Sequence, residues 1–541
     1  MAVGLQIACF PHGKSSTRNV DWTRPGHVHL VGIGGSGTRA LARVLSQRGW
    51  RVSGSDVDSD GLEAVLPPGT FLRTGHHATG VPPKVDVVVH SDAIGPDNPE
   101  LRAARSRSVA TLSYFETVGQ LMQGCHGLAV AGTHGKSTTT AITAWILVEA
   151  GRDPTVVCGA ATLGQNDGGR DGQGPLMLAE ACEYRANFLK LRPRHAIILG
   201  IEPDHFDCYA NLDEAERAYG RFAASIAPDG LLLVQADCAA TRRAAAGASC
   251  RVETFGLMTG VPLASRQCGA KHGQDARGTH RVEMFGSAAT CDWSARPIDH
   301  VRGQYRFDLL HRGQALCQIE LPLAGEHNML NAVAAAALAW HQGVEPAQIA
   351  GAIGRFPGVR RRLEPVGAWR GVTIIDDFAH HPTELTATLT AVHQMHPDRR
   401  VCCVFQPHQV SRTTHLLDEF AASLHNGFRR RGAGRLADRL WVSEIFRARE
   451  PAPSPESVTS ADLADRVRRY GHDVATVHRL DAIGLDLENH LVSGDVLLTI
   501  GAGNIWRVLD RFRSSTDKTA GRRARSAANE CLKTESSRID G

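Results

Sequence analysis

A short glycine-containing segment of the chain carries residue types that could bind a nucleotide. Its glycines would let backbone N–H groups approach phosphate oxygens, Lys136 would reach the terminal phosphates, and Ser137 would ligate Mg²⁺. A full Walker A pattern would need glycine at Val130, so the segment is a shorter form of this loop. We predict a nucleoside-triphosphate site; the alternative is a glycine turn without a ligand. The predicted nucleotide-binding residues are Gly132, Thr133, His134, Gly135, Lys136, Ser137 and Thr138.

The residues on either side of this loop predict the elements that hold it. Leu128–Ala131 is an apolar run typical of a buried parallel strand. A helical pattern follows the loop, with Ile142 and Ile146 on one face, and Gly151 predicts its end. Strand, loop and helix together place the free N–H groups of a helix start beside the expected anion.

A second glycine-rich turn lies near the start of the chain. It follows a predicted strand, His27–Val31, and a helix and a second strand lead from it to Asp56. This βαβ pattern is typical of a pyrophosphate site, for a dinucleotide or equally for a UDP-sugar, and a turn without a ligand is the alternative. Ser91 follows a third strand, Val85–His90, at the edge where such sheets bind ligands. The turn contributes Gly32, Gly34, Gly35, Ser36 and Gly37.

Three polar residues after the central loop are candidates for the same site. Glu180 follows the apolar strand Leu176–Ala179, where a Mg²⁺ ligand or a water-positioning acid belongs. His205 follows another strand, although a histidine in a polar loop is more often merely solvated. Asn328 begins an alanine-rich helix, where it could cap the helix or equally read an adenine edge.

A third αβ unit carries a further cluster of polar side chains. A basic hinge, Arg360–Arg362, precedes its first strand, Val372–Ile375. Six side chains should converge on one sheet edge of this unit. A metal site is an alternative that we disfavour, because adjacent histidines of an extended chain point to opposite sides. The six are Asp376, Asp377, His380, His381, His408 and Arg412.

Composition narrows the class of protein. A length of 541 residues predicts three or four domains, and 42% hydrophobic and 21% charged residues are typical of globular chains. A net charge of +4 is too small to indicate a nucleic-acid partner. We find no run of about 18 apolar residues, so we expect no membrane insertion. Thirteen cysteines without a CxxC pair favour free thiols in the cytoplasm.

Nine motifs occur in a fixed order along the chain: GIGGSG, GTHGKSTTT, EACEYR, EPDHFD, GEHNMLNA, GVRRRLE, DDFAHHPTE, FQPHQVSRT and GAGNIW. Together they resemble the Mur ligase family from His27 to Phe512. The resemblance implies an α/β protein with a Rossmann-like UDP-substrate domain at 26–121, a central P-loop ATPase-like domain at 122–357 and a Rossmann-like C-terminal domain at 358–513. We expect a flexible extension at 1–25 and a disordered tail at 514–541.

The resemblance also implies roles for individual residues. Lys136, Glu180 and His205 match catalytic positions, and Asn328, Arg362 and Asp377 join the ATP-binding loop. The metal site for Mg²⁺ would comprise Ser137, Glu180 and His205. The UDP-linked substrate would contact Gly32, Gly34, Gly35, Ser36, Gly37, Asp56 and Ser91. The incoming amino acid would contact His381, His408 and Arg412.

The implied activity is the ATP-dependent joining of L-alanine to the carboxylate of UDP-N-acetylmuramate through an acyl phosphate, in peptidoglycan precursor synthesis. Two residues depart from many family members: Phe378 stands in place of tyrosine, and Gln409 in place of arginine. Both changes bear on which amine is used. Residues 255–320, which we expect to be irregular and antiparallel, and the loop Phe428–Arg435 have no clear family counterpart.

Three other functions stay open at this stage. A muropeptide-recycling ligase of the same family would add a preformed tripeptide instead of L-alanine. Phe378 favours that branch, whereas the FQPH…SRT motif and the GIGGSG turn favour the alanine-adding branch. An NAD-linked oxidoreductase would use the first glycine turn and would have no use for Lys136. A non-catalytic nucleotide-binding scaffold would bind ATP without amine-dependent phosphate release. A homodimer is likewise left open.

Overall fold

The computed structural model describes residues 20–258, 291–428, 438–448, 450, 457–470 and 474–512, with the backbone alone at 474–478. The tail expected at 514–541 lies outside the described residues, as do most of the extension expected at 1–25 and most of the loop Phe428–Arg435. Trp22 falls within that extension. Its indole lies 5.0 Å from the ring of Trp50 and donates to Gln120 at 3.0 Å, so residues 20–25 adjoin the first domain.

The first domain is a five-stranded parallel sheet in the order β3-β2-β1-β4-β5. β1 is buried along its whole length, its two histidines included, as expected for a strand covered on both faces. The order reverses between β1 and β4, which is where an open α/β sheet binds ligands. The elements are β1 (His27–Val31), α1 (Ser36–Gln47), β2 (Arg51–Asp56), β3 (Phe71–Thr74), β4 (Val87–His90), α2 (Pro99–Ser106), β5 (Ala110–Ser113) and α3 (Tyr114–Gln123).

The middle domain contains a ten-stranded sheet in the order β15-β14-β13-β12-β11-β10-β6-β9-β7-β8. Its strands are β6 (His126–Ala131), β7 (Thr155–Cys158), β8 (Gly168–Arg170), β9 (Leu176–Glu180), β10 (His195–Ile198), β11 (Leu231–Gln235), β12 (Arg251–Leu257), β13 (Trp293–Val301), β14 (Gln304–His311) and β15 (Gln314–Ala324). The expected antiparallel section is confirmed at β13–β15, and residues 259–290 lie outside the described residues.

Two helices of the middle domain, α4 and α7, lie beside the central loop. α4 and α7 pack against each other, and the alanine-rich sequence of α7 lets its backbone approach closely. α7 is buried along most of its length, so alanines replace the polar face that a surface helix would show. The helices are α4 (Lys136–Glu149), α5 (Leu212–Ala224), α6 (Ala239–Ala245), α7 (Glu326–His341) and α8 (Pro346–Gly354).

The third domain contains a six-stranded sheet in the order β16-β17-β21-β18-β19-β20, parallel except at β16. Its strands are β16 (Glu364–Trp369), β17 (Val372–Asp377), β18 (Val401–Phe405), β19 (Arg439–Ser443), β20 (Val474–His478) and β21 (Val496–Ile500). Its helices are α9 (Pro382–Met395), α10 (Val410–His415), α11 (Leu417–Gly427), α12 (Ser460–Arg469) and α13 (Leu480–His490).

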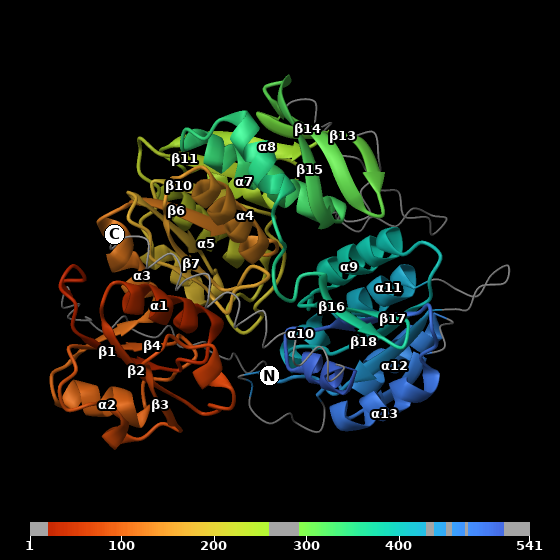
Figure 1. Ribbon diagram of the computed structural model, residues 1–541, viewed down its shortest axis with the longest axis horizontal. Coiled ribbons are helices and arrows are strands. Elements are labelled where there is room, and N and C mark those ends of the chain that lie inside the picture. Colours follow the sequence, from red (N-terminus) through yellow and green to blue (C-terminus); the bar gives the residue numbers. More distant parts are fainter. Residues whose placement is uncertain are drawn as a thin grey trace, which may run out of the picture.

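The three sheets confirm the predicted three-domain α/β fold, while the exact domain boundaries stay predictions (Figure 1). Contacts of the middle domain reach both neighbours. Arg43 and Arg48 of α1 pair with Asp167 and Asp171 at 2.9 and 2.6 Å. Across the described ranges, no helix is both long and apolar enough to cross a membrane.

Candidate active site

The central glycine loop has the backbone of an anion site. Gly132 and Gly135 adopt φ angles of +133° and +80°, which favour glycine over L-residues. A Cβ at Gly135 would also collide with the side-chain oxygen of Asn331. No side chain of the described residues caps the start of α4, so its first N–H groups are free to face an anion.

Lys136 lies folded back onto this loop. Its Nζ donates to the carbonyls of Gly132 and Thr133 at 2.5 and 3.0 Å and pairs with Glu183 at 2.9 Å. Burial would lower the pKa of Lys136, but the charge and hydrogen bond of Glu183, together with the charge of Glu180, raise the pKa above its usual range. Lys136 is therefore a cation that can exchange these oxygens for those of a phosphate.

Ser137 and Glu180 lie together as the sequence predicts. The Ser137 hydroxyl donates to one Glu180 carboxylate oxygen at 2.9 Å, and the Gly159 N–H donates to the other at 2.7 Å. A hydroxyl beside a carboxylate supplies the oxygen ligands that Mg²⁺ prefers. These donors fit the ion that the loop implies.

His205 reaches this region through Glu183, a residue that the sequence reasoning missed. The His205 Nε2 lies 3.5 Å from one carboxylate oxygen of Glu183, and the other carboxylate oxygen of Glu183 pairs with Lys136. Glu183 is buried and stands three residues beyond Glu180 in the EACEYR motif. The short spacing between Glu180 and Glu183 was the sequence feature that could have identified Glu183 as a candidate site residue.

Asn328 does not cap α7, which was one of the two roles that the sequence left open. Gly325 is the N-cap of α7, and no side chain of the described residues caps that helix. Asn328 instead donates to the Ala324 carbonyl at 2.7 Å and accepts from Asn331 at 3.3 Å. Asn331 in turn accepts from Thr139 at 3.2 Å, so the pair of asparagines abuts the phosphate loop.

The third domain brings two of the predicted nucleotide contacts to the junction. Asp377 is buried and accepts from the Leu363 and Ala379 N–H groups at 2.7 and 2.8 Å. Burial raises the pKa of Asp377 to about 6, against the opposing charge of Arg362. The guanidinium carbon of Arg362 lies 5.0 Å from the ring centroid of Phe378.

The polar cluster of the third domain divides into separate groups. Arg412, 2% exposed, donates to Asp204 of the middle domain at 2.7 Å and contacts His408. The His380 ring lies 5.8 Å from that of His408, so these three residues gather as predicted. Asp376 departs from that group, because it pairs with Arg361 at 3.0 Å.

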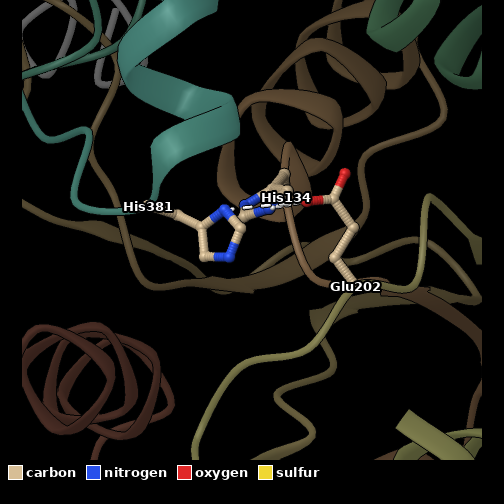
Figure 2. A group of neighbouring side chains, drawn as sticks. All are labelled: His134, Glu202 and His381. Atoms are coloured by element: carbon tan, nitrogen blue, oxygen red, sulfur yellow. Dashed lines mark ion pairs between the residues drawn. The ribbon is translucent and has the colours of Figure 1, made fainter. Parts of the chain in front are cut away.

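His381 makes contacts different from those of His380, which pairs with Glu384 at 3.2 Å. The His381 Nδ1 lies 3.6 Å from Glu202 of the middle domain, whose carboxylate lies 3.4 Å from His134. The other His134 nitrogen lies 3.3 Å from Glu384 of α9. Burial would lower the pKa of His134, but the two carboxylates raise it to about 10. Figure 2 shows His134, Glu202 and His381 converging from two domains.

The first glycine turn gathers its predicted residues at the carboxyl ends of β1, β2 and β4. The Gly34 N–H donates to Asp56 at 2.8 Å. Gly32 adopts φ +78°, and a Cβ there would lie 3.1 Å from the Cβ of Ser91. Gly35 is the N-cap of α1, which begins at Ser36, and Gly37 lies against Tyr114.

Family models match all three domains. The model of the Mur ligase family, catalytic domain, matches residues 27–126. The Mur ligase middle domain matches residues 130–339, and the Mur ligase, glutamate ligase domain, matches residues 361–503. Together these matches cover most of the chain.

Individual relatives agree with these matches. The chain is 37% identical to the UDP-N-acetylmuramate–L-alanine ligase of Salinibacter ruber, over 90% of this chain and 94% of the relative. It is 35% identical to the enzyme of that name from Clostridium novyi, over 90% and 96% of the two chains. The crystal structure of UDP-N-acetylmuramate-alanine ligase from Thermotoga maritima has a TM-score of 0.70 at 24% identity, over 90% and 98%, which supports the fold. The chain therefore belongs to the Mur ligase family.

Proposed function

We propose that this protein is an ATP-dependent ligase that joins L-alanine to the carboxylate of UDP-N-acetylmuramate, in peptidoglycan precursor synthesis. The observation that carries the proposal is the central loop, where the cation Lys136 and the Ser137–Glu180 pair lie at one helix start. The 37% identity to a relative of that activity over 90% of the chain supports the choice of substrates.

The central loop would hold the triphosphate. Lys136 exchanges its loop carbonyls and Glu183 for phosphate oxygens, and the free N–H groups of α4 face the same charge. Ser137, Glu180 and His205 would hold Mg²⁺, which neutralises charge between a polyanionic nucleotide and a carboxylate when bound. Asn328 and, from the third domain, Arg362 and Asp377 would complete the nucleotide site.

The reaction needs activation of a carboxylate, because a free carboxylate does not react with an amine at neutral pH. The γ-phosphoryl group of ATP passes to the muramoyl carboxylate, which gives an acyl phosphate and ADP. The L-alanine amine then attacks the acyl carbon, the carbon–oxygen bond to phosphate breaks, and phosphate and a proton leave. Buried donors such as Lys136 stabilise the charge that develops.

The other two substrates would bind on either side of this loop. The first glycine turn, with Asp56 and Ser91, would hold the UDP group of the muramoyl substrate. His408 and Arg412 would hold L-alanine, while His381, the third residue expected in this role, faces Glu202 instead. Arg412 of the third domain pairs with Asp204 of the middle domain. This part of the site is therefore complete only when the third domain is closed against the middle domain.

Phosphate release measured with each amine tests the proposal. The full chain is supplied with ATP, Mg²⁺ and UDP-N-acetylmuramate, and then with L-alanine, L-serine, glycine or the muropeptide tripeptide. We expect release with L-alanine and much less with the tripeptide. Release only with the tripeptide would identify the recycling branch. ATP binding without any amine-dependent release would identify a scaffold.

Several features of organisation are part of the proposal. We expect domain boundaries near 121/122 and 357/358, which limited proteolysis of the full chain would locate. A homodimer would appear as twice the chain mass in sedimentation equilibrium. We expect the enzyme to act in the cytoplasm, where ATP is supplied.

A further inference from the structure

His134, Glu202 and His381 form a compact cluster across the junction of the middle and third domains (Figure 2). His134 comes from the phosphate loop, Glu202 from the segment after β10, and His381 from the residue before α9. One ligand atom of each lies within 4.8 Å of the others. The Mg²⁺ site proposed above uses different residues.

The separations within this cluster fit a small four-coordinate ion. Metal–ligand bonds of about 2.0–2.1 Å, as Zn²⁺ makes to nitrogen and oxygen, place neighbouring ligands of a tetrahedron about 3.3–3.4 Å apart. The His134 Nε2 lies 3.4 Å from Glu202 Oε2, and the His381 Nδ1 lies 3.6 Å from the same oxygen. Two of the three edges therefore match a tetrahedron, and the two histidine nitrogens lie within 4.8 Å of each other. The ion would displace the proton that Glu202 and Glu384 favour on His134.

The contacts behind the cluster are those that orient metal ligands. A metal-bound histidine usually donates its other ring nitrogen to a carboxylate or a backbone carbonyl. The other nitrogen of His134 faces Glu384 at 3.3 Å, and that of His381 faces the Pro203 carbonyl at 3.2 Å. The Thr383 hydroxyl donates to Glu202 at 2.6 Å. Each of the three ligands thus has its own supporting partner.

The hydrogen bonds of His381 fix which ring nitrogen would face the ion. Its Nδ1 accepts from the Thr383 N–H at 3.3 Å, so Nε2 carries the proton and donates to the Pro203 carbonyl. Nδ1 faces Glu202, and a bound ion would take its lone pair in place of the long hydrogen bond from the Thr383 N–H.

We propose that His134, Glu202 and His381 form a binding site for a divalent transition-metal ion of the Zn²⁺ class that ties the middle domain to the third domain. Two imidazoles and one carboxylate select Zn²⁺ or Co²⁺ over Mg²⁺, which prefers oxygen ligands in an octahedron. Opening of the junction would then break a metal–ligand bond. Because ligases of this kind must open to release product, the ion slows turnover.

The bound ion is detected without any assay of activity. The full chain is freed of metal with a chelator and titrated with Co²⁺ in a large excess of Mg²⁺, without nucleotide. We expect one equivalent of Co²⁺ with the visible absorption of a four-coordinate site and without a thiolate charge-transfer band. Absence of Co²⁺ uptake overturns the proposal and leaves the cluster as an ion-paired junction. A thiolate band overturns it as well, because it places the ion on cysteine.

Matched variants locate the ion. Glu202→Gln keeps the shape of the side chain and removes the anionic ligand, and we expect Co²⁺ affinity to fall at least about 100-fold. His205→Ala is the control, since it removes a histidine of the proposed Mg²⁺ site alone. Loss of uptake in His205→Ala with normal uptake in Glu202→Gln overturns the proposal.

A gentler variant and a second measurement cover the case in which Glu202→Gln does not fold. Thr383→Val removes only the hydroxyl behind Glu202, and we expect about 10- to 100-fold weaker Co²⁺ binding. In the wild-type chain, Zn²⁺ should raise the melting temperature, because it binds the folded form. An unchanged melting temperature at saturating Zn²⁺, or unchanged Co²⁺ affinity in Thr383→Val, overturns the proposal. Neither result depends on the ligase activity proposed above.

Discussion

Two strand–glycine turn–helix units lie in this chain, one in the first domain and one in the middle domain, and they can be aligned position by position. β1 ends at Val31 and α1 begins at Ser36, while β6 ends at Ala131 and α4 begins at Lys136. Ser36 therefore stands where the central unit has Lys136, and glycine stands where the central unit has Ser137. The two loops share a frame but differ in the side chains at the helix start.

The side chains that contact the two loops also differ. In the first unit the carboxylate of Asp56 accepts from the Gly34 N–H at 2.8 Å. In the central unit a lysine, a serine hydroxyl and a buried carboxylate meet at the loop. A glycine loop alone can hold a phosphate group, whereas a cation and oxygen ligands for a metal are needed to transfer one. Under the proposed function, phosphate holding and phosphate transfer are therefore separated between two domains.

Replacement of Lys136 by alanine should produce the largest difference between the units. We expect turnover to fall on the order of 10³-fold or more, because a buried cation at the transferred phosphate is lost. Binding of UDP-N-acetylmuramate, measured by calorimetry, should be unchanged. Lys84→Ala, at an exposed position of the first domain, is the control. Normal turnover in Lys136→Ala would contradict the assignment of the central loop.

Alanine at the glycines of each loop should separate the two substrates. Gly135→Ala puts a side chain at φ +80° and against Asn331, and the left-handed backbone alone costs about 1–2 kcal/mol. We expect the KM for ATP to rise about 10- to 100-fold. Gly32→Ala should raise the KM for the UDP-linked substrate instead. Equal effects of both variants on both KM values would break the comparison.

Asp56→Asn should act on the first unit alone and more weakly. The amide keeps an oxygen for the Gly34 N–H but loses the negative charge, so the charge-assisted hydrogen bond weakens by about 1 kcal/mol. We expect the KM for the UDP-linked substrate to change about five- to tenfold with kcat unchanged. A change in kcat at saturating substrate would show that the first turn also takes part in transfer.

Thr38→Val should give the smallest effect. The Thr38 hydroxyl donates to the Gly32 and Gly35 carbonyls at 2.7 and 2.9 Å, and valine keeps its volume. We expect a loss of about 1 kcal/mol in the free energy of unfolding, measured in urea. Thr139→Val is the counterpart in α4, where the lost bond is the one to Asn331. An effect on turnover in Thr38→Val larger than that in Thr139→Val would contradict the division of roles.

Strand positions were the most predictable part of the fold. Val401–Phe405 is a continuous apolar run and His27–Val31 is an apolar run broken only by histidines, and the structure has strands with the same bounds. Such runs indicate strands covered on both faces, so the sequence near each of them suffices. The order of glycine loop, lysine and serine predicted the central loop in the same local way.

Contacts between elements far apart in the sequence were not predictable from local sequence. Glu183, Glu202 and Glu384 look like many other carboxylates of the chain, and only the docking of separate elements selects their partners. The capping role left open for Asn328 is not realised, for a different reason. Gly325, with φ +93°, takes the N-cap position, which leaves the asparagine free to bond within the helix start.

The ion pair of Lys136 with Glu183 has a consequence for selectivity among anions. In this conformation the loop carries its own counter-charge, 2.9 Å from the lysine nitrogen. To bind Lys136, a small anion such as chloride or free phosphate must displace the Glu183 carboxylate. That carboxylate is part of the chain and stays beside the lysine. A triphosphate offers several contacts at once and can outcompete it, so the resting loop is shielded against the small anions that surround it.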